Sequence, residues 1–173
     1  MENNIHILFT EEQIRERAKE IGKQIMKDYE GEEVVLVGTL RGAVVWMADM
    51  MKEVTMENLM IDFIVASSYS GTNTTGVVKI SKDLTEDVTG KHVIVVEDIV
   101  DTGITLSKVL DYILAKGAKT VEICALLNKP SRRLVDVKPK YVGFDIDNLF
   151  VIGYGLDYDQ KYRNLPYVAY IDA

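Results

Sequence analysis

The chain has 173 residues, of which 47% are hydrophobic, and its 20 basic and 27 acidic side chains give a net charge of −7 at pH 7. This length and hydrophobic content are those of one globular domain, expected over residues 1–173. The negative charge argues against nonspecific binding to nucleic acid or to an anionic membrane. No segment approaches the about 20 apolar residues of a membrane-spanning helix, and no signal peptide is evident, so a cytoplasmic protein is expected.

Strands and helices alternate along the chain. A capping box at Thr10 and Gln13 predicts the start of a helix whose apolar stripe ends near Tyr29. The later patterns predict, in order, strand 34–37, helix 44–51, strands 59–66 and 93–96, a helix from 105 to the stop at 117, and strands 121–127 and 141–144. This alternation is typical of a twisted, mostly parallel α/β sheet flanked by helices. Cys124, the single cysteine, lies in an apolar strand and is expected to be a buried, inert thiol.

The helix predicted over 44–51 is rich in large apolar side chains: Trp46, Met47, Met50 and Met51. One buried helical face does not need so much apolar surface. The surplus indicates self-association, as a homodimer or homotetramer, but packing in the core of the monomer explains it almost as well.

Ten consecutive polar, small or turn-forming residues at 67–76, among them Ser68 and Tyr69, interrupt the alternation. This composition is too poor in apolar groups to form a packed element. Two interpretations stay open. The segment is either a mobile lid over bound substrates or an exposed hairpin between the strand that ends near Ser67 and another strand at 77–80.

The strongest chemical signal is at 93–105, where an apolar run ends in Glu97 and Asp98 and then turns through Asp-Thr-Gly into a helix. The branched residues 93–96 predict a buried parallel strand, so the two carboxylates are expected at its end. Such carboxylates can accept hydrogen bonds from a ribose diol or hold a hydrated Mg²⁺. Free amides in the following loop, at a helix N-terminus, can hold a phosphate. The Walker lysine and the dinucleotide-binding glycines are absent.

This pattern of two acidic residues, two apolar residues and Asp-Thr-Gly-x-Thr resembles the 5-phosphoribosyl-1-pyrophosphate (PRPP) motif of type I phosphoribosyltransferases. The resemblance implies the type I phosphoribosyltransferase fold, with a small purine-binding hood from the N-terminus and roughly 145–173, and a flexible loop at 67–76. It implies that PRPP and its ribose phosphate are bound by Glu97, Asp98, Asp101, Thr102, Gly103, Ile104 and Thr105. Asp101 would lie beside the anomeric carbon and act as the general base.

Further segments extend the resemblance over nearly the whole chain, to the hypoxanthine-guanine branch of that family. Leu40-Arg41-Gly42 resembles the pyrophosphate loop, in which the non-proline bond before the basic residue is often cis. The resemblance therefore implies that Arg41, Gly42 and Arg163 contact pyrophosphate. Whether the bond between Leu40 and Arg41 is cis does not follow from the sequence.

The purine site is implied by two segments, 126–129 and 148–166. Lys129 resembles the family's lysine that donates to the purine 6-oxo group. An ammonium has only donors, so it favours a carbonyl oxygen at that place and opposes an amino group. Phe150 would stack on the base and the backbone of Val151 would read its edge. Asp157 would lie near the purine 2-position and help to hold a second Mg²⁺, the first being held by Glu97 and Asp98.

The function implied is purine salvage: Mg²⁺-dependent transfer of the phosphoribosyl group from PRPP to hypoxanthine or guanine, giving IMP or GMP and pyrophosphate. Ser68 and Tyr69 would belong to the loop that covers these substrates. One alternative is a xanthine-preferring or other phosphoribosyltransferase of the same fold. Another is an RNA-binding regulator built on that fold, which the charge of −7 disfavours. His6 and His92 are expected to be structural.

Overall fold

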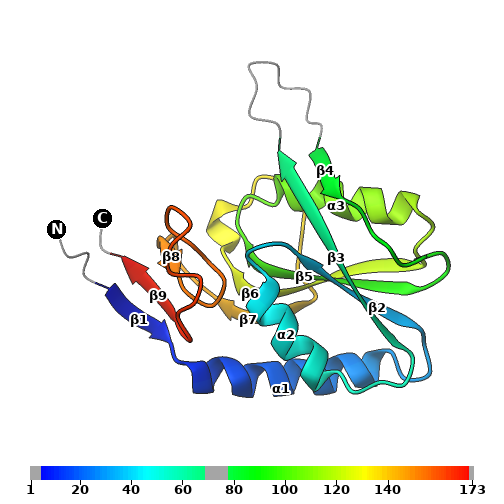
Figure 1. The fold of residues 1–173 in the computed structure, drawn as a ribbon, viewed down its shortest axis with the longest axis horizontal. Coiled ribbons are helices and arrows are strands. Elements are labelled where there is room, and N and C mark those ends of the chain that lie inside the picture. Colours follow the sequence, from blue (N-terminus) through cyan, green and yellow to red (C-terminus); the bar gives the residue numbers. More distant parts are fainter. Residues whose placement is uncertain (1–4, 69–77, 172–173) are drawn as a thin grey trace.

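The computed structural model describes residues 5–68 and 78–171, which form one large and one small sheet (Figure 1). The six-stranded sheet has the order β4-β3-β2-β5-β6-β7, and the three-stranded sheet has the order β1-β9-β8. The strands are β1 (Ile5–Phe9), β2 (Val34–Thr39), β3 (Leu59–Ser68), β4 (Val78–Lys82), β5 (His92–Val100), β6 (Thr120–Asn128), β7 (Tyr141–Asp145), β8 (Val151–Ile152) and β9 (Val168–Ile171). The helices are α1 (Glu11–Asp28), α2 (Val44–Glu53), α3 (Ile104–Ala115) and the short 3-10 helix η1 (Pro130–Arg132).

The large sheet is mostly parallel, which confirms the predicted fold class. β3, β2, β5, β6 and β7 pair in parallel, and β4 alone is antiparallel, at the edge beside β3. Residues 93–96 of the central strand β5 are completely buried, which explains their continuous apolar sequence. Among the described helices, none is long and apolar enough to cross a membrane.

Alternate residues of the central strands pack into two separate cores. Ile94 and Val96 of β5 lie in the core that includes α1 and α2, whereas Val93 and Val95 lie in the core that includes α3. Helices therefore cover both faces of the sheet, and α1 begins with the expected capping box. Its Thr10 Oγ1 accepts from the amide of Gln13 at 3.2 Å, and Gln13 Oε1 accepts from the amide of Thr10 at 2.8 Å.

Most of the large apolar side chains of α2 lie inside the protein. Trp46, Met47 and Met50 are fully buried against α1 and the sheet, and only Met51 of this group is exposed. Core packing therefore explains these three residues, and they give no support to self-association.

Two strands extend further than the sequence indicated. β5 continues through Glu97 and Asp98 to Val100, so the two carboxylates lie inside the strand and not after its end. The reason is that β6 continues to pair beyond the last β2 partner, for instance between Val100 and Asn128. β3 likewise continues to Ser68 because Ser67 and Ser68 pair with β4. Tyr69 and the rest of the predicted lid to residue 76 lie outside the described residues.

Asp62 on β3 is a buried anchor for the chain after β4. Its carboxylate accepts from the amides of Phe63, Thr85 and Glu86 at 2.7, 2.6 and 2.8 Å, and from Lys82 Nζ at 3.3 Å. Burial raises the pKa of Asp62, but these hydrogen bonds to the charged form outweigh burial and leave the pKa below its ordinary value.

We expect Asp62→Asn to lower the free energy of unfolding at pH 7 by about 1–3 kcal/mol, because the neutral amide loses charge-assisted hydrogen bonds. The folded-state pKa is depressed, so the carboxylate stabilises the fold above its unfolded-state pKa of about 4. This contribution is lost as the pH falls through the folded-state pKa. Urea titrations across this range should show the two proteins converging at acid pH. Asp136→Asn, at an exposed position, is the control, and a difference independent of pH would contradict the assignment.

Candidate active site

A cavity of about 330 Å³ lies at the carboxyl ends of the central parallel strands. In open α/β sheets this edge is where ligands bind. The cavity is lined by Thr39, Leu40, Gly42, Ala66, Glu97, Asp98, Ile99, Val100, Asp101, Thr102, Gly103, Thr105, Leu106 and Val109. It therefore brings together most of the predicted PRPP-binding residues and Gly42. Ile104, at the first position of α3, is exposed and does not line it.

Glu97 and Asp98 form a half-buried acidic pair on one side of the cavity. Glu97 Oε1 accepts from Thr39 Oγ1 at 2.7 Å, and Asp98 Oδ1 accepts from the amide of Ile99 at 2.7 Å. Burial, together with the neighbouring Asp98 carboxylate, raises the pKa of Glu97 well above its ordinary value. A cation beside the pair would stabilise the charged form of Glu97 and so lower its pKa again.

The acidic pair fits Mg²⁺, which is commonly held by one or two carboxylates and completes its shell with water and substrate oxygens. Over residues 5–68 and 78–171, no three His, Cys, Asp or Glu side chains come together as a complete metal-binding group. The third predicted metal ligand, Asp157, therefore does not join the acidic pair in one cluster.

Residues 40–42, the loop between β2 and α2, lie directly against the acidic pair. The peptide bond between Leu40 and Arg41 is cis. A Cβ added at Gly42 would overlap the carboxylate of Asp98, so only glycine lets this loop approach so closely. Gly155, which has a φ of 100°, lies on the other side of the loop, and a Cβ there would overlap the carbonyl of Gly42.

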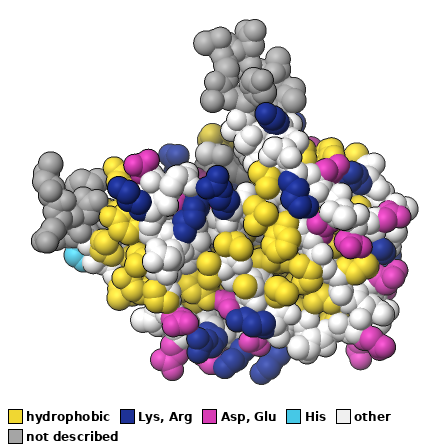
Figure 2. All heavy atoms as spheres, in the orientation of Figure 1, with side chains coloured by type: hydrophobic (Ala, Val, Ile, Leu, Met, Phe, Trp, Pro, Cys, Tyr) yellow, Lys and Arg dark blue, Asp and Glu magenta, His cyan; other side chains and the backbone are white. Residues whose placement is uncertain are grey.

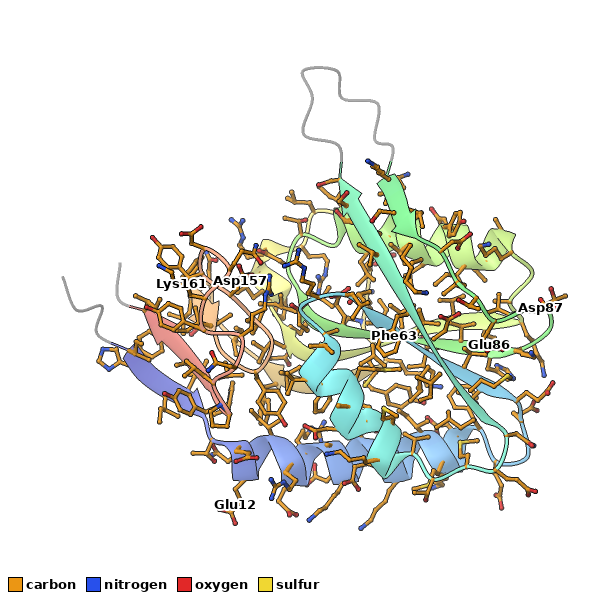
Figure 3. The ribbon with its side chains drawn as sticks, viewed as in Figure 1. Glu12, Phe63, Glu86, Asp87, Asp157 and Lys161 are labelled. Atoms are coloured by element: carbon orange, nitrogen blue, oxygen red, sulfur yellow. The ribbon has the colours of Figure 1, made fainter. Side chains whose placement is uncertain are left out.

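Arg41 and Arg163, which are far apart in the sequence, meet at one side chain. Gln160 Oε1 accepts from Arg41 at 3.3 Å and from Arg163 at 3.2 Å. Arg163 also donates to the carbonyl of Gly155 at 2.7 Å and forms an ion pair with Asp157 at 2.9 Å. Its Nε is buried and has no hydrogen-bond partner among the residues that the structure describes. Figure 3 shows Asp157 and Lys161 on the excursion between β8 and β9, which carries this cluster beside the small sheet. Gln160 was not singled out from the sequence, because its role depends on two distant arginines.

Asp101 lies in the loop of residues 101–103 between β5 and α3. Its Oδ1 accepts from Arg132 Nε at 3.1 Å, and its carbonyl accepts from Arg133 at 2.7 Å. Sequence reasoning missed both arginines, since nothing in the order Arg132-Arg133 distinguishes them from a solvated basic pair. No hydrogen bond is formed by Oδ2 of Asp101 within the described part of the chain, so this oxygen remains able to accept a proton.

Lys129 follows β6 and is only 7% exposed. Its Nζ donates to the carbonyl of Leu149 at 2.7 Å, and burial lowers its pKa. Phe150 is 52% exposed and contacts Tyr158 edge-on, so it is not a core aromatic. Val151 is buried and pairs with β9 in the small sheet. Phe150 and Val151, the latter at the start of β8, therefore directly follow Leu149, the residue that Lys129 contacts.

Known proteins match this chain along its whole length. A family model described as the phosphoribosyl transferase domain matches residues 6–159. Hypoxanthine phosphoribosyltransferase of Salmonella typhimurium is 50% identical over 172 residues, covering 98% of this chain and 96% of that protein. Hypoxanthine-guanine phosphoribosyltransferase of Streptococcus pneumoniae is 44% identical, covering 98% and 94% respectively. A crystal structure of a hypoxanthine phosphoribosyltransferase from Staphylococcus aureus has a TM-score of 0.91 and 44% identity, covering 96% of this chain and 90% of that chain.

Proposed function

Because this chain belongs to the phosphoribosyltransferase family, we propose that it transfers the 5-phosphoribosyl group of PRPP to hypoxanthine or guanine in purine salvage. The products are IMP or GMP and pyrophosphate. The observation that supports this most is the surroundings of the strand-end cavity. The acidic pair and Gly42 line it, and the amide of Lys129 donates to the carbonyl of Val100, another lining residue. Arg41 directly precedes Gly42 and shares Gln160 with Arg163.

The sugar phosphate occupies the strand-end cavity. The amides of Thr102, Gly103, Ile104 and Thr105, at the N-terminus of α3, hold its 5-phosphate. Glu97 and Asp98 hold the ribose diol and Mg²⁺. The metal, when bound, neutralises part of the pyrophosphate charge. Asp157, which forms the ion pair with Arg163, is the candidate for a second, water-mediated metal contact.

Pyrophosphate leaves between the loop of residues 40–42 and the small sheet. As the anomeric bond breaks, negative charge grows on pyrophosphate, and the guanidinium groups of Arg41 and Arg163 stabilise it there. Their shared contact with Gln160 keeps both arginines at one place before substrate arrives. The approach of Gly42 to Asp98 brings backbone amides of this loop toward the same anion.

The purine lies between Lys129 and the small sheet, which we propose is the hood. Lys129 donates to the 6-oxo group, Phe150 stacks on the ring, and the backbone of Val151 reads the purine edge. The exposure of Phe150 supports this role, since a ring open to solvent gains area when a base covers it.

Asp101 is the proposed general base. Its Oδ1 is held by Arg132, so Oδ2 accepts the proton released from the purine imidazole nitrogen as the new bond to the anomeric carbon forms. The carboxylate also offers negative charge to the positive sugar in the transition state.

A panel of purines with PRPP and Mg²⁺ tests the proposed function. We expect hypoxanthine and guanine to be converted to IMP and GMP, with negligible use of adenine. An RNA-binding titration run beside it tests the regulator alternative. Preferential use of xanthine, or tight RNA binding without transferase activity, would overturn the proposal.

The acidic pair gives a second test. Replacing Glu97 by Gln and Asp98 by Asn should weaken Mg²⁺-PRPP binding by about 10-fold or more while the melting temperature changes little, since the loss falls on the ligand and not on the apolar core. The control is Glu86→Gln with Asp87→Asn, an exposed pair of the same residue types far from Asp157 in Figure 3. Calorimetry measures both variants, and unchanged PRPP affinity in the first would remove this pair from metal and diol binding.

We also propose a cytoplasmic enzyme that self-associates as a homodimer or homotetramer. Val44 and Met51 of α2 remain exposed, and Figure 2 shows apolar side chains gathered over the middle of the face formed by α2 and β3. Sedimentation velocity over a range of concentrations tests the assembly. A single monomeric species at every concentration would contradict it.

A further inference from the structure

Three successive carbonyls at the end of β5 and directly after it, those of residues 100, 101 and 102, all accept hydrogen bonds from segment 129–134. The donors are the amide of Lys129 at 2.9 Å, the guanidinium of Arg133 at 2.7 Å and the amide of Leu134 at 3.0 Å. Two of these donors belong to the backbone and one to a side chain. Segment 129–134 thus holds the whole β5–α3 loop from one side.

This arrangement fixes where the amides of the loop point. In a trans peptide the carbonyl of one residue and the amide of the next point in opposite directions. With carbonyls 100–102 turned toward segment 129–134, the amides of Asp101, Thr102 and Gly103 turn away from it. These three residues line the strand-end cavity, so two of the amides proposed to hold phosphate, those of Thr102 and Gly103, are oriented by hydrogen bonds made on the opposite side.

Arg133 provides the side-chain part of this contact. One guanidinium nitrogen donates to the carbonyl of Asp101 and the other to Oδ1 of Asn128. Asn128 is itself held, because its Nδ2 donates to Asp145 at 2.7 Å. The aliphatic stem of Arg133 lies over Gly103, where an added Cβ would come within 3.2 Å of Cδ. Arg133 therefore links the end of β6 to both ends of the β5–α3 loop.

We propose that Arg133 is a positioning residue that fixes the PRPP-binding loop relative to the purine-binding lysine. This inference rests on the proposed function. Lys129 is joined to β6 directly after Asn128, so the contact of Arg133 with Asn128 and Asp101 sets the separation between the base site and the sugar site. Bond formation needs the purine nitrogen and the anomeric carbon held in near-attack geometry, and a displacement of about 1 Å costs about 10²-fold in rate.

Arg133→Met tests the proposal because methionine keeps the stem and removes the guanidinium. We expect kcat to fall about 10-fold and the KM for PRPP to rise about 10-fold, giving about 10²-fold in kcat/KM. The KM for hypoxanthine should stay within about 3-fold, since the contact of Lys129 with Leu149 is untouched. Amide hydrogen exchange should accelerate at 101–104 and stay unchanged in β6.

Arg133→Lys should recover part of the loss, because one ammonium can still donate to the Asp101 carbonyl. Lys138→Met, a charge loss at an exposed position, should change none of these values. Wild-type kcat and KM for PRPP in Arg133→Met, or equal rises in both KM values, would overturn the positioning role. If wild-type protein did not use PRPP, the proposed function would fail, and the exchange measurement alone would still report whether Arg133 orders the loop.

Discussion

Lys129→Met is expected to lower kcat/KM for hypoxanthine and guanine by about 10³-fold or more while PRPP binding persists. The side chain is only 7% exposed and is held by the carbonyl of Leu149, so its ammonium is presented at a fixed place with little water to replace it. Methionine has similar length and no donor, which leaves the purine 6-oxo group unpaired. Stacking on Phe150 cannot compensate, because it does not depend on the 6-substituent.

The same contact explains the expected rejection of adenine. The 6-amino group would meet the donors of Lys129, and a buried mismatch of donors can discriminate by about 10⁴-fold. Steady-state kinetics with all three bases and calorimetry with PRPP measure both effects. Lys161→Met, at an exposed position of the excursion between β8 and β9, is the control and should behave as wild type. Comparable efficiency of the wild-type enzyme with adenine and hypoxanthine would refute the assignment of Lys129.

Asp101→Asn is expected to lower turnover by about 10²-fold or more, within the range found when a general base is lost. The amide of asparagine is nearly isosteric with the carboxylate, and its oxygen can still accept from Arg132. Arg133 donates to the backbone carbonyl of Asp101, which the substitution does not change. The fold and the affinity for PRPP should therefore change little. What is lost is the proton acceptor and one negative charge beside the sugar.

Rapid-quench kinetics separates the chemical step from product release in this variant, and calorimetry measures PRPP binding. Asp136→Asn removes a carboxylate from an exposed surface and should leave both unchanged. A chemical step of normal rate in Asp101→Asn would exclude Asp101 as the base and direct attention to another acceptor in the cavity.

Local sequence patterns predicted most of the fold. The capping box of α1 and the apolar run of β5 depend on neighbouring residues, so their sequences predicted them correctly. The end of β5 was predicted too early because its continuation to Val100 depends on β6, which is distant in the sequence. Burial of Trp46 likewise depends on α1 packing over α2, which no periodicity in α2 alone reports.

In the candidate site too, the local motif could be predicted from the sequence, whereas the contacts between distant segments could not. The residues from Glu97 to Thr105 form one motif and could be proposed from the sequence alone. The contacts that hold them could not. Gln160 is shared by two arginines more than a hundred residues apart, and Arg133 reaches the Asp101 carbonyl from the segment after β6. Such contacts arise from tertiary packing and leave no local signal.

The contact between Gly155 and the carbonyl of Gly42 limits directed evolution of this enzyme toward new bases. Any side chain at either position would force apart two backbones, or a backbone and the carboxylate of Asp98, in the middle of the site. A library randomised at both positions should return glycine at each. Variants with altered base preference should instead come from the neighbours of the purine, such as Leu149 and Phe150, where side chains can change in size without moving the pyrophosphate loop.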